Sequence, residues 1–323
     1  MSVAVTGGSG VVGSAVVRHL VDGGEEVWAL ARSAESSHDL SELGARVVTG
    51  DLFDRDALAR LVKGRSRVFH IAGVNEMCSR DPERMWRVNV EGSNRVVAAC
   101  IDAGVERLVH TSSAVAIGEP EGTMGTERSP HRGEFLSEYE RSKTVAERMV
   151  LDRAAEIDVV FVNPSSVQGP GRSTGTGAIF LAIARGDLPF LVDTTISLVD
   201  IDDCARGHLL AAEKGLRGER YLLSGPVLTI RQAVSMLRRK TGRRSSPRFL
   251  HPGVVTAVAP VVGAVAHLVG VQPPLCPESA RVLLHGHQYD GSRATRELGL
   301  EYTSLEETLD RTLAWFDAEG LLD

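Results

Sequence analysis

A glycine-rich turn near the start of the chain constrains the fold most strongly. Residues 6–13 have a G-x-x-G-x-x-G spacing and stand between an apolar strand, Ser2–Thr6, and an amphipathic helix, Val12–Val21. Such glycines let the chain turn tightly and let a phosphate approach the backbone, while the following helix N-terminus offers free N–H groups. A glycine turn without a ligand is the alternative, but this strand-to-helix context favours dinucleotide binding. The predicted pyrophosphate contacts are Gly7, Gly10, Val11, Val12 and Gly13.

Short apolar runs alternate with longer amphipathic runs through the first two-thirds of the chain. Further strands are predicted at Val27–Ala31, Arg46–Thr49, Val68–Ile71, Arg107–Ser112 and Asp158–Val162, and further helices at Arg55–Val62, Glu83–Ala103 and Ser137–Ala155. Continuously apolar strands are typical of a sheet covered on both faces. Because strands and helices alternate, the pattern predicts right-handed βαβ units and a doubly wound parallel sheet.

The regular alternation is lost after about Asn163 and returns only at Ser197–Ala212 and Arg220–Leu223. We therefore expect an α/β protein in which a Rossmann sheet occupies residues 1–165 with a return segment at about 196–223. A smaller mixed α/β substrate domain would occupy residues 166–323. A chain of 323 residues with 43% hydrophobic residues is large enough for both parts.

Charge and cysteine content limit the possible partners. The net charge of −6 gives no reason to expect nucleic acid, because phosphate-binding surfaces normally need a basic excess. Cys78, Cys100, Cys204 and Cys276 lie far apart, and no pair has metal-ligand or redox-motif spacing. Since the N-terminus also lacks a signal-peptide core, we expect a reduced cytoplasmic protein without a metal.

The segment Gly253–Val271 is nearly all apolar and almost long enough to span a bilayer. It contains Pro260 and His267, and bilayer spans rarely carry an ionisable residue without a partner. We expect a buried or lid helix rather than membrane insertion.

The end of the second strand bears on the choice of cofactor. NAD sites usually place an Asp or Glu there to hold the ribose 2′-hydroxyl, whereas this chain has Arg32 and Ser33. A guanidinium suits a 2′-phosphate as both charge and fork donor, which favours NADP (NADPH) over NAD. An ordinary surface role for Arg32 is the alternative. Asp51 and Leu52 follow the third strand and could border the adenine, and the small Ala72 and Gly73 would let the cofactor lie close.

Tyr139 and Lys143 carry the clearest catalytic signal. Residues four apart share one face of a helix, so Lys143 can hold its charge near the Tyr139 phenol. A nearby cation lowers a tyrosine pKa and prepares it for proton exchange near neutral pH. The pair follows a strand ending in Ser112 and Ser113, and the carboxyl end of such a strand is where open α/β sheets place their ligands.

Taken together, these features resemble an extended short-chain dehydrogenase/reductase of the NAD-dependent epimerase/dehydratase superfamily. The chain is most similar to the dihydroflavonol-4-reductase and 3β-hydroxysteroid dehydrogenase-like branch and to hopanoid-associated sugar epimerase-like proteins. The resemblance also rests on Asp51-Leu52, His70–Gly73, Asn89–Asn94, Ser113-Ala114, Asn163–Pro170, Val199–Asp203 and Arg296–Gly299.

The resemblance implies a role for each matching residue. Tyr139 would be the acid/base, Lys143 would bind the nicotinamide ribose and tune Tyr139, and Ser113, rather than Ser112, would donate a hydrogen bond to the substrate oxygen. Asn89 would assist a proton relay. Pro164, Ser166 and Val167 would line the nicotinamide. A homodimer is implied as well, since Glu83–Ala103 and Ser137–Ala155 pair across dimers in the family.

The same centre serves ketoreductases and NAD-dependent nucleotide-sugar epimerases or dehydratases. Three features favour an NADPH-dependent ketoreductase for a hydrophobic or polycyclic carbonyl compound: Arg32, the Asn163–Ser166 stretch, and the absence of a tyrosine before Gly118. The apolar residues Val254–Val271 and Pro273–Leu275 could wall its pocket, or form an ordinary packed helix. A binding protein that has lost catalysis is a third class, although Tyr139 and Lys143 are both present.

Overall fold

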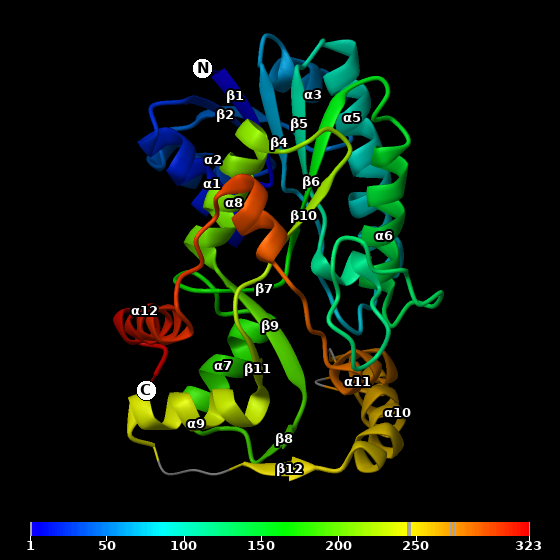
Figure 1. Ribbon diagram of the computed structural model, residues 1–323, viewed down its shortest axis with the longest axis vertical. Helices are drawn as coiled ribbons and strands as arrows, with labels where there is room; N and C mark the ends of the chain where they lie inside the picture. The colour runs from blue at the N-terminus through cyan, green and yellow to red at the C-terminus, as the bar shows by residue number, and fades with distance from the viewer. Residues whose placement is uncertain (1, 244–246, 272, 274, 323) are drawn as a thin grey trace.

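A computed structural model describes residues 2–243, 247–271, 273 and 275–322, apart from the His267 side chain. Its largest element is a seven-stranded sheet in which all neighbours pair in parallel (Figure 1). The order is β10-β6-β5-β4-β1-β2-β3. The strands are β1 (Ser2–Thr6), β2 (Glu26–Ala31), β3 (Arg46–Thr49), β4 (Arg67–His70), β5 (Arg107–Thr111), β6 (Asp158–Pro164) and β10 (Arg220–Leu223). The doubly wound parallel sheet predicted from the sequence is confirmed.

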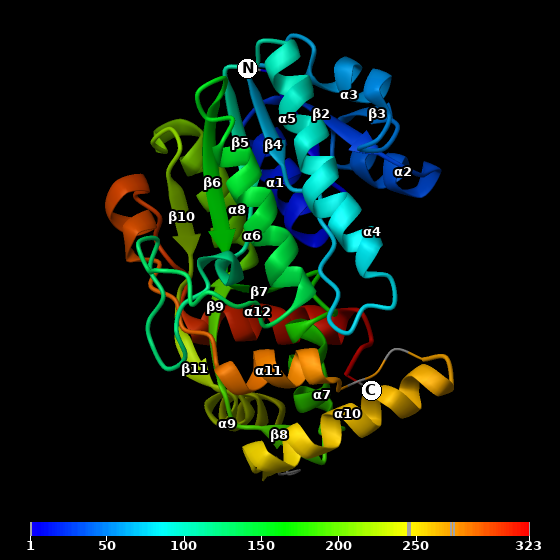
Figure 2. The same ribbon diagram turned by 90° about the vertical axis from the view of Figure 1, so that its right-hand side faces the viewer.

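Helices cover both faces of this sheet, as Figures 1 and 2 show. One face carries α1 (Val11–Asp22) and α8 (Ile201–Lys214), which pack with β1, β2 and β6 in one hydrophobic core. The other carries α3 (Arg55–Val62), α5 (Ser93–Asp102) and α6 (Glu138–Leu151), which enclose a second core. The sequence pattern predicts α3 to the residue and α1 and α6 within a few residues.

Two helical segments differ from the prediction. The helix expected over Glu83–Ala103 consists of α4 (Pro82–Trp86), a π-helical turn η1 (Arg87–Gly92) and α5. The helix α2 (Ala34–Glu42) was not predicted, because Leu40 is its one buried residue and gives no apolar periodicity. A capping box between Ser33 and Ser36 begins α2 instead.

A second lobe lies below the carboxyl ends of the large sheet (Figures 1 and 2). It contains a mixed sheet of β7 (Ser166–Gln168), β9 (Thr195–Asp200) and β11 (Val227–Thr229), and a parallel pair of β8 (Phe190–Val192) and β12 (Arg248–Leu250). Helices α7 (Thr176–Arg185), α9 (Ile230–Thr241) and α12 (Leu305–Ala318) share its core with β9 and β11. The exact domain limits, 1–165 and 166–323, stay a prediction.

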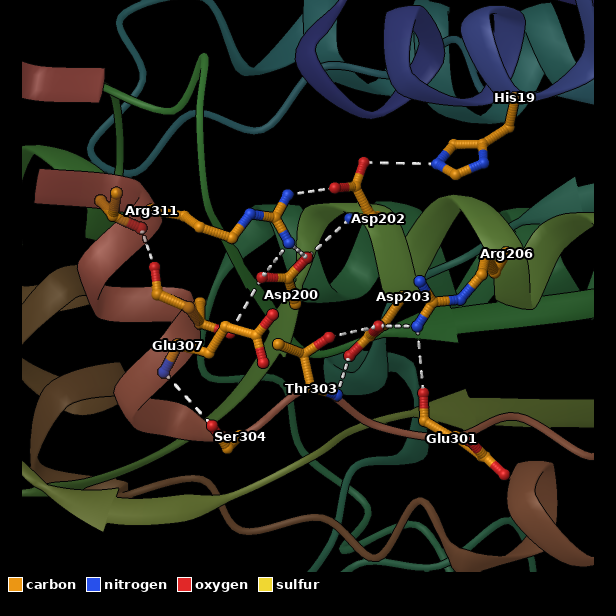
Figure 3. Close-up of polar contacts among 12 residues, drawn as sticks. His19, Asp200, Asp202, Asp203, Arg206, Glu301, Thr303, Ser304, Glu307 and Arg311 are labelled. Atoms are coloured by element: carbon orange, nitrogen blue, oxygen red, sulfur yellow. Dashed lines mark hydrogen bonds and ion pairs between the residues drawn. The ribbon is translucent and has the colours of Figure 1, made fainter. Parts of the chain in front are cut away.

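Carboxylates at the start of α8 join α12 of the second lobe to the helices that cover one face of the large sheet (Figure 3). Asp200 caps α8, and its fully buried side chain accepts hydrogen bonds from Thr308 (2.9 Å) and from Arg311 (3.3 Å) on α12. Arg311 also pairs with Asp202, which lies 3.3 Å from His19 on α1. These contacts therefore fix the positions of α12, α8 and α1 relative to one another.

A disulfide between Cys78 and Cys276 overturns the expectation that the four cysteines are reduced and separate. The two residues are 198 positions apart in the sequence, so no local spacing signals the pair. Cys100 and Cys204 are free and buried, as expected of hydrophobic packing positions. Cys276 caps α11 (Pro277–His285), so the bond attaches that helix to the loop after β4.

The apolar segment Gly253–Val271 forms α10 (Pro252–Leu268). No helix among the described residues is long and apolar enough to cross a membrane. Val255 and Ala259 pack against α11, whereas Val261 and Val265 are 62% and 53% exposed. The helix thus packs on one face and presents apolar side chains on the other. Pro274, part of the predicted pocket wall, lies outside the described residues.

Candidate active site

The glycine turn has the shape that a dinucleotide needs. Gly10 caps the N-terminus of α1 without a side-chain hydrogen bond, so no cap side chain competes for the N–H groups of the first helical turn. A Cβ on Gly13 would overlap the Gly7 carbonyl, and one on Gly7, whose φ is 77°, would overlap the Ala72 backbone. The close approach of these segments accounts for glycine at both positions.

A cavity opens beside this turn, at the carboxyl ends of β1, β2 and β4. Its lining includes ten of the predicted cofactor contacts: Gly7, Gly10, Val11, Val12, Gly13, Arg32, Asp51, Leu52, Ala72 and Gly73. Glycine backbone, a helix N-terminus and the arginine at the end of β2 together suit a nicotinamide dinucleotide. The residues present therefore fit such a cofactor.

Arg32 and Ser33 play different parts. Arg32 is exposed and lines the cavity, and no Asp or Glu occupies the end of β2. The Ser33 hydroxyl instead accepts the Ser36 N–H at 3.2 Å in the capping box of α2. Of the two residues predicted to contact the 2′-phosphate, Arg32 therefore lines the cavity, whereas the Ser33 side chain caps α2.

Ser113 and Tyr139 come together as predicted. Ser113 is buried just after β5, where it begins the short 3-10 helix η2 (Ala114–Ile117), and its side chain lies close enough to Tyr139, near the start of α6, to lower the Tyr139 pKa. The hydroxyl of the neighbouring Ser112 is buried with no hydrogen-bond partner among the described residues. The structure thus distinguishes Ser113 from Ser112.

Lys143 lies one turn after Tyr139 in α6. Its buried ammonium donates to the Thr111 carbonyl at 2.7 Å, and a Cβ on Gly73 would lie 3.8 Å from it. Since Gly73 lines the cofactor cavity, the charge is close to that cavity. Burial lowers the pKa of Lys143 to about 8, while Glu147 opposes this shift.

The expectation that Lys143 lowers the pKa of Tyr139 is wrong for this structure. Burial raises the Tyr139 pKa above its usual value, and the nearby Ser113 side chain and the charge of Arg172 only partly oppose that shift. The phenol is therefore protonated at neutral pH. A protonated phenol is the form that can donate to a carbonyl oxygen.

Asn89 lies in the π-helical turn η1, and such turns often occur at functional sites. Its side-chain amide donates to the Val74 carbonyl and to Ser142 Oγ, both at 2.9 Å, and its oxygen accepts the Val74 N–H at 2.7 Å. Ser142 in turn donates to the Tyr139 carbonyl at 2.8 Å. Asn89 thus connects the cavity wall to the helix that carries Tyr139.

The predicted nicotinamide contacts at the end of β6 and in β7 do not line the cavity. Pro164 ends β6 and is buried, and Val167 packs in the core beneath the sheet. The Ser166 hydroxyl donates to Thr176 Oγ1 at 2.9 Å. Their role as cofactor contacts stays a prediction.

Arg172 is a site residue that the sequence reasoning missed. It lines the cofactor cavity together with Gly7 and Gly73, and its charge acts on Tyr139. No acidic side chain among the described residues forms an ion pair with it, and its Nε is buried without a hydrogen-bond partner. No local motif marks it, because it reaches the cavity from the loop after β7.

A polar network beneath the centre was missed as well. Asn163 donates to the Ser113 carbonyl at 3.0 Å and to Glu147 at 2.7 Å. Glu147 lies one turn beyond Lys143 on α6 and raises its pKa. The same carboxylate thus supports Lys143 and, through Asn163, the backbone of Ser113.

Comparisons with known proteins agree with this geometry. The NAD dependent epimerase/dehydratase family matches residues 3–224. A putative dihydroflavonol 4-reductase from Synechocystis sp. is 34% identical, over 98% of this chain and 94% of its own length. Sterol demethylase protein B from Methylococcus capsulatus is 32% identical over the full length of both chains. The crystal structure of gox2253 has a TM-score of 0.88 and 32% identity, covering 100% of this chain and 99% of its own.

The chain therefore belongs to the NAD dependent epimerase/dehydratase family and has the extended short-chain dehydrogenase/reductase fold. It is an NAD(P)-dependent oxidoreductase. The resemblance inferred from the motifs is confirmed.

Proposed function

We propose that this protein is an NADPH-dependent ketoreductase that acts on a carbonyl group of a hydrophobic or polycyclic small molecule. The observation that carries the proposal is Arg32, which lines the cavity at the end of β2 where an NAD site would place a carboxylate. A guanidinium binds a 2′-phosphate through charge and paired N–H donors. NADPH is the form of the cofactor that carries reducing equivalents to a ketone.

The bound nicotinamide would supply the hydride, and the protein would supply position and a proton. In the proposed reaction Tyr139 donates its phenol proton to the carbonyl oxygen, and Ser113 donates a hydrogen bond to the same atom. The Lys143 ammonium, which lies close to the cavity wall at Gly73, would bind the nicotinamide ribose. Asn89, through Ser142, holds the first turn of α6 and so positions Tyr139.

Two observations support the proposed substrate class. One relative is named for a dihydroflavonol and another for a sterol, which favours a polycyclic substrate. The second lobe, which carries the apolar helix α10, is where substrate selection is expected. A homodimer through α5 and α6 belongs to the same proposal.

A nucleotide-sugar epimerase or dehydratase that uses NAD is the second candidate. The family description favours it, and the Ser113–Tyr139–Lys143 centre could abstract and return a proton equally well. An epimerase regenerates its cofactor in every cycle, whereas a ketoreductase consumes one NADPH for each product molecule.

This difference in stoichiometry defines the test. The purified protein is incubated with NADPH and cyclic hydrophobic ketones, and in parallel with NAD and nucleotide sugars, and products are separated by chromatography. We expect NADPH consumption equal to alcohol formation. Interconversion of a nucleotide sugar with no net cofactor change would overturn the ketoreductase proposal.

A further inference from the structure

A buried group of side chains outside the dinucleotide cavity has the composition of a metal site. Glu119 follows η2, His285 ends α11, and His287 lies two residues later. The Glu119 side chain is 1% exposed, that of His285 5% and that of His287 14%. One carboxylate and two imidazoles are the donor set of several zinc sites with three protein ligands.

The spacing of the donor atoms fits one small ion. Glu119 Oε1 lies 2.6 Å from His287 Nδ1 and 3.3 Å from His285 Nε2. One ligand atom from each residue lies within 4.8 Å of the others. Ligands bound tetrahedrally at zinc distances of about 2.1 Å stand ~3.4 Å apart, so small side-chain shifts would bring all three into coordination.

The hydrogen bonds of the group leave buried polar atoms unused. Glu119 Oε2, His285 Nε2 and His287 Nε2 have no hydrogen-bond partner among the described residues. His287 Nδ1 faces both Glu119 Oε1 and the Tyr289 hydroxyl, the latter at 2.9 Å. Unsatisfied buried polar atoms cost free energy, and coordination of a cation by His285 and Glu119 removes part of that cost.

The charges around Glu119, His285 and His287 also favour binding of a cation. Glu119 supplies a carboxylate that faces both imidazoles. Arg132 pairs with Glu140 rather than with the Glu119 carboxylate. Neutral imidazoles are metal ligands and do not themselves compensate a carboxylate.

We propose that Glu119, His285 and His287 bind a divalent metal ion of the zinc class. The ion attaches the loop that follows the Ser113 segment to the chain after α11, and so joins the nucleotide-binding part to the second lobe. This assignment does not depend on the ketoreductase proposal, because none of the three ligands belongs to the centre at Tyr139.

Measuring the zinc bound per chain tests the proposed metal site directly. Protein without a histidine tag is expressed with added zinc, passed over a chelating resin and measured by inductively coupled plasma mass spectrometry. Wild-type protein is expected to retain about one zinc ion per chain. His285→Gln, His287→Gln and Glu119→Gln are each expected to lose it, while the control His38→Gln, exposed on α2, retains it. Zinc content near zero in the wild type, or unchanged in the Glu119→Gln variant, would overturn the proposal.

Thermal unfolding separates loss of the ion from loss of the fold. After treatment with EDTA, added zinc is expected to raise the Tm of the wild type and of His38→Gln by on the order of 5 °C. The His287→Gln variant should melt near the metal-free wild type and should not respond to zinc. If all ligand variants fail to fold, the wild-type zinc content and Tm response decide. A wild-type Tm that zinc leaves unchanged would contradict the site.

Discussion

The nucleotide-binding part and the second lobe hold their functional groups by different means. In the former, the backbone forms the site: a glycine turn, the N-terminus of α1 and the ends of parallel strands meet at one cavity. In and next to the second lobe, buried charged side chains from distant segments meet instead, as Asp200 does with Arg311 and Glu119 with His285. Backbone sites leave a local pattern in the sequence, and side-chain clusters do not.

The largest effect is expected from replacing Tyr139, the proposed proton donor at the carboxyl end of the large sheet. Tyr139→Phe removes the proposed proton donor and should lower turnover by about 10²–10⁴-fold, with cofactor affinity nearly unchanged. Steady-state rates and a cofactor titration measure the two quantities. Turnover close to that of the wild type would remove Tyr139 from the proposed mechanism, whereas loss of cofactor binding would indicate a structural defect.

The side-chain clusters should control stability rather than chemistry. Asp200→Ala removes the buried carboxylate from Thr308 and Arg311, and we expect the free energy of unfolding to fall by about 3 kcal/mol. The matched control is Asp193→Ala, which breaks an exposed pair with Arg231 and should cost less than about 1 kcal/mol. Equal losses in urea unfolding would show that α12 is not held by this cluster.

The disulfide should stabilise the junction between the two parts. Cys276→Ser removes the covalent link between the loop after β4 and α11 and should lower the free energy of unfolding by about 2–4 kcal/mol. Dithiothreitol should destabilise the wild type by a similar amount and leave the variant unaffected. If the reductant shifts both equally, or neither, the bond does not contribute to stability in solution.

The pH dependence of reduction should follow Lys143. Its folded pKa lies below the usual value, at about 8, so the ammonium is charged below that pH and neutral above it. The Tyr139 pKa is raised, so the phenol stays protonated over the same range. We therefore expect kcat/KM for reduction to be flat near neutrality and to fall as pH rises through about 8. Lys143→Arg should remove that fall, and an unchanged profile would contradict the assignment to Lys143.

Much of the fold and of the cofactor site could be predicted, because local patterns encode them. The strands β1 and β3 and the helix α3 match their predicted limits, since apolar runs and caps fix them. The glycine turn and the Tyr139–Lys143 spacing are equally local. Ser113 could be chosen over Ser112 only through the family resemblance, and the effect of the Ser113 side chain on the Tyr139 pKa supports that choice.

The remaining features depend on contacts that the chain makes at long range. Arg172 enters the cavity from a loop in the second lobe, and Cys78 meets Cys276 across 198 residues. The upward pKa shift of Tyr139 depends on burial, which helix periodicity does not reveal. Helix α2 forms from a cap rather than from an apolar face. Each of these needs the folded arrangement before its partners are known.

A fluorescence titration of NADPH and NADH tests the central claim most directly, with wild type, Arg32→Ala and the control Arg18→Ala, an exposed arginine on α1. We expect the wild type and Arg18→Ala to bind NADPH more tightly than NADH. Arg32→Ala should weaken NADPH by about tenfold or more, the loss of a charged hydrogen bond, and leave NADH nearly unchanged. Tighter binding of NADH by the wild type, or equal weakening of both cofactors in Arg32→Ala, would contradict the account and favour the epimerase candidate.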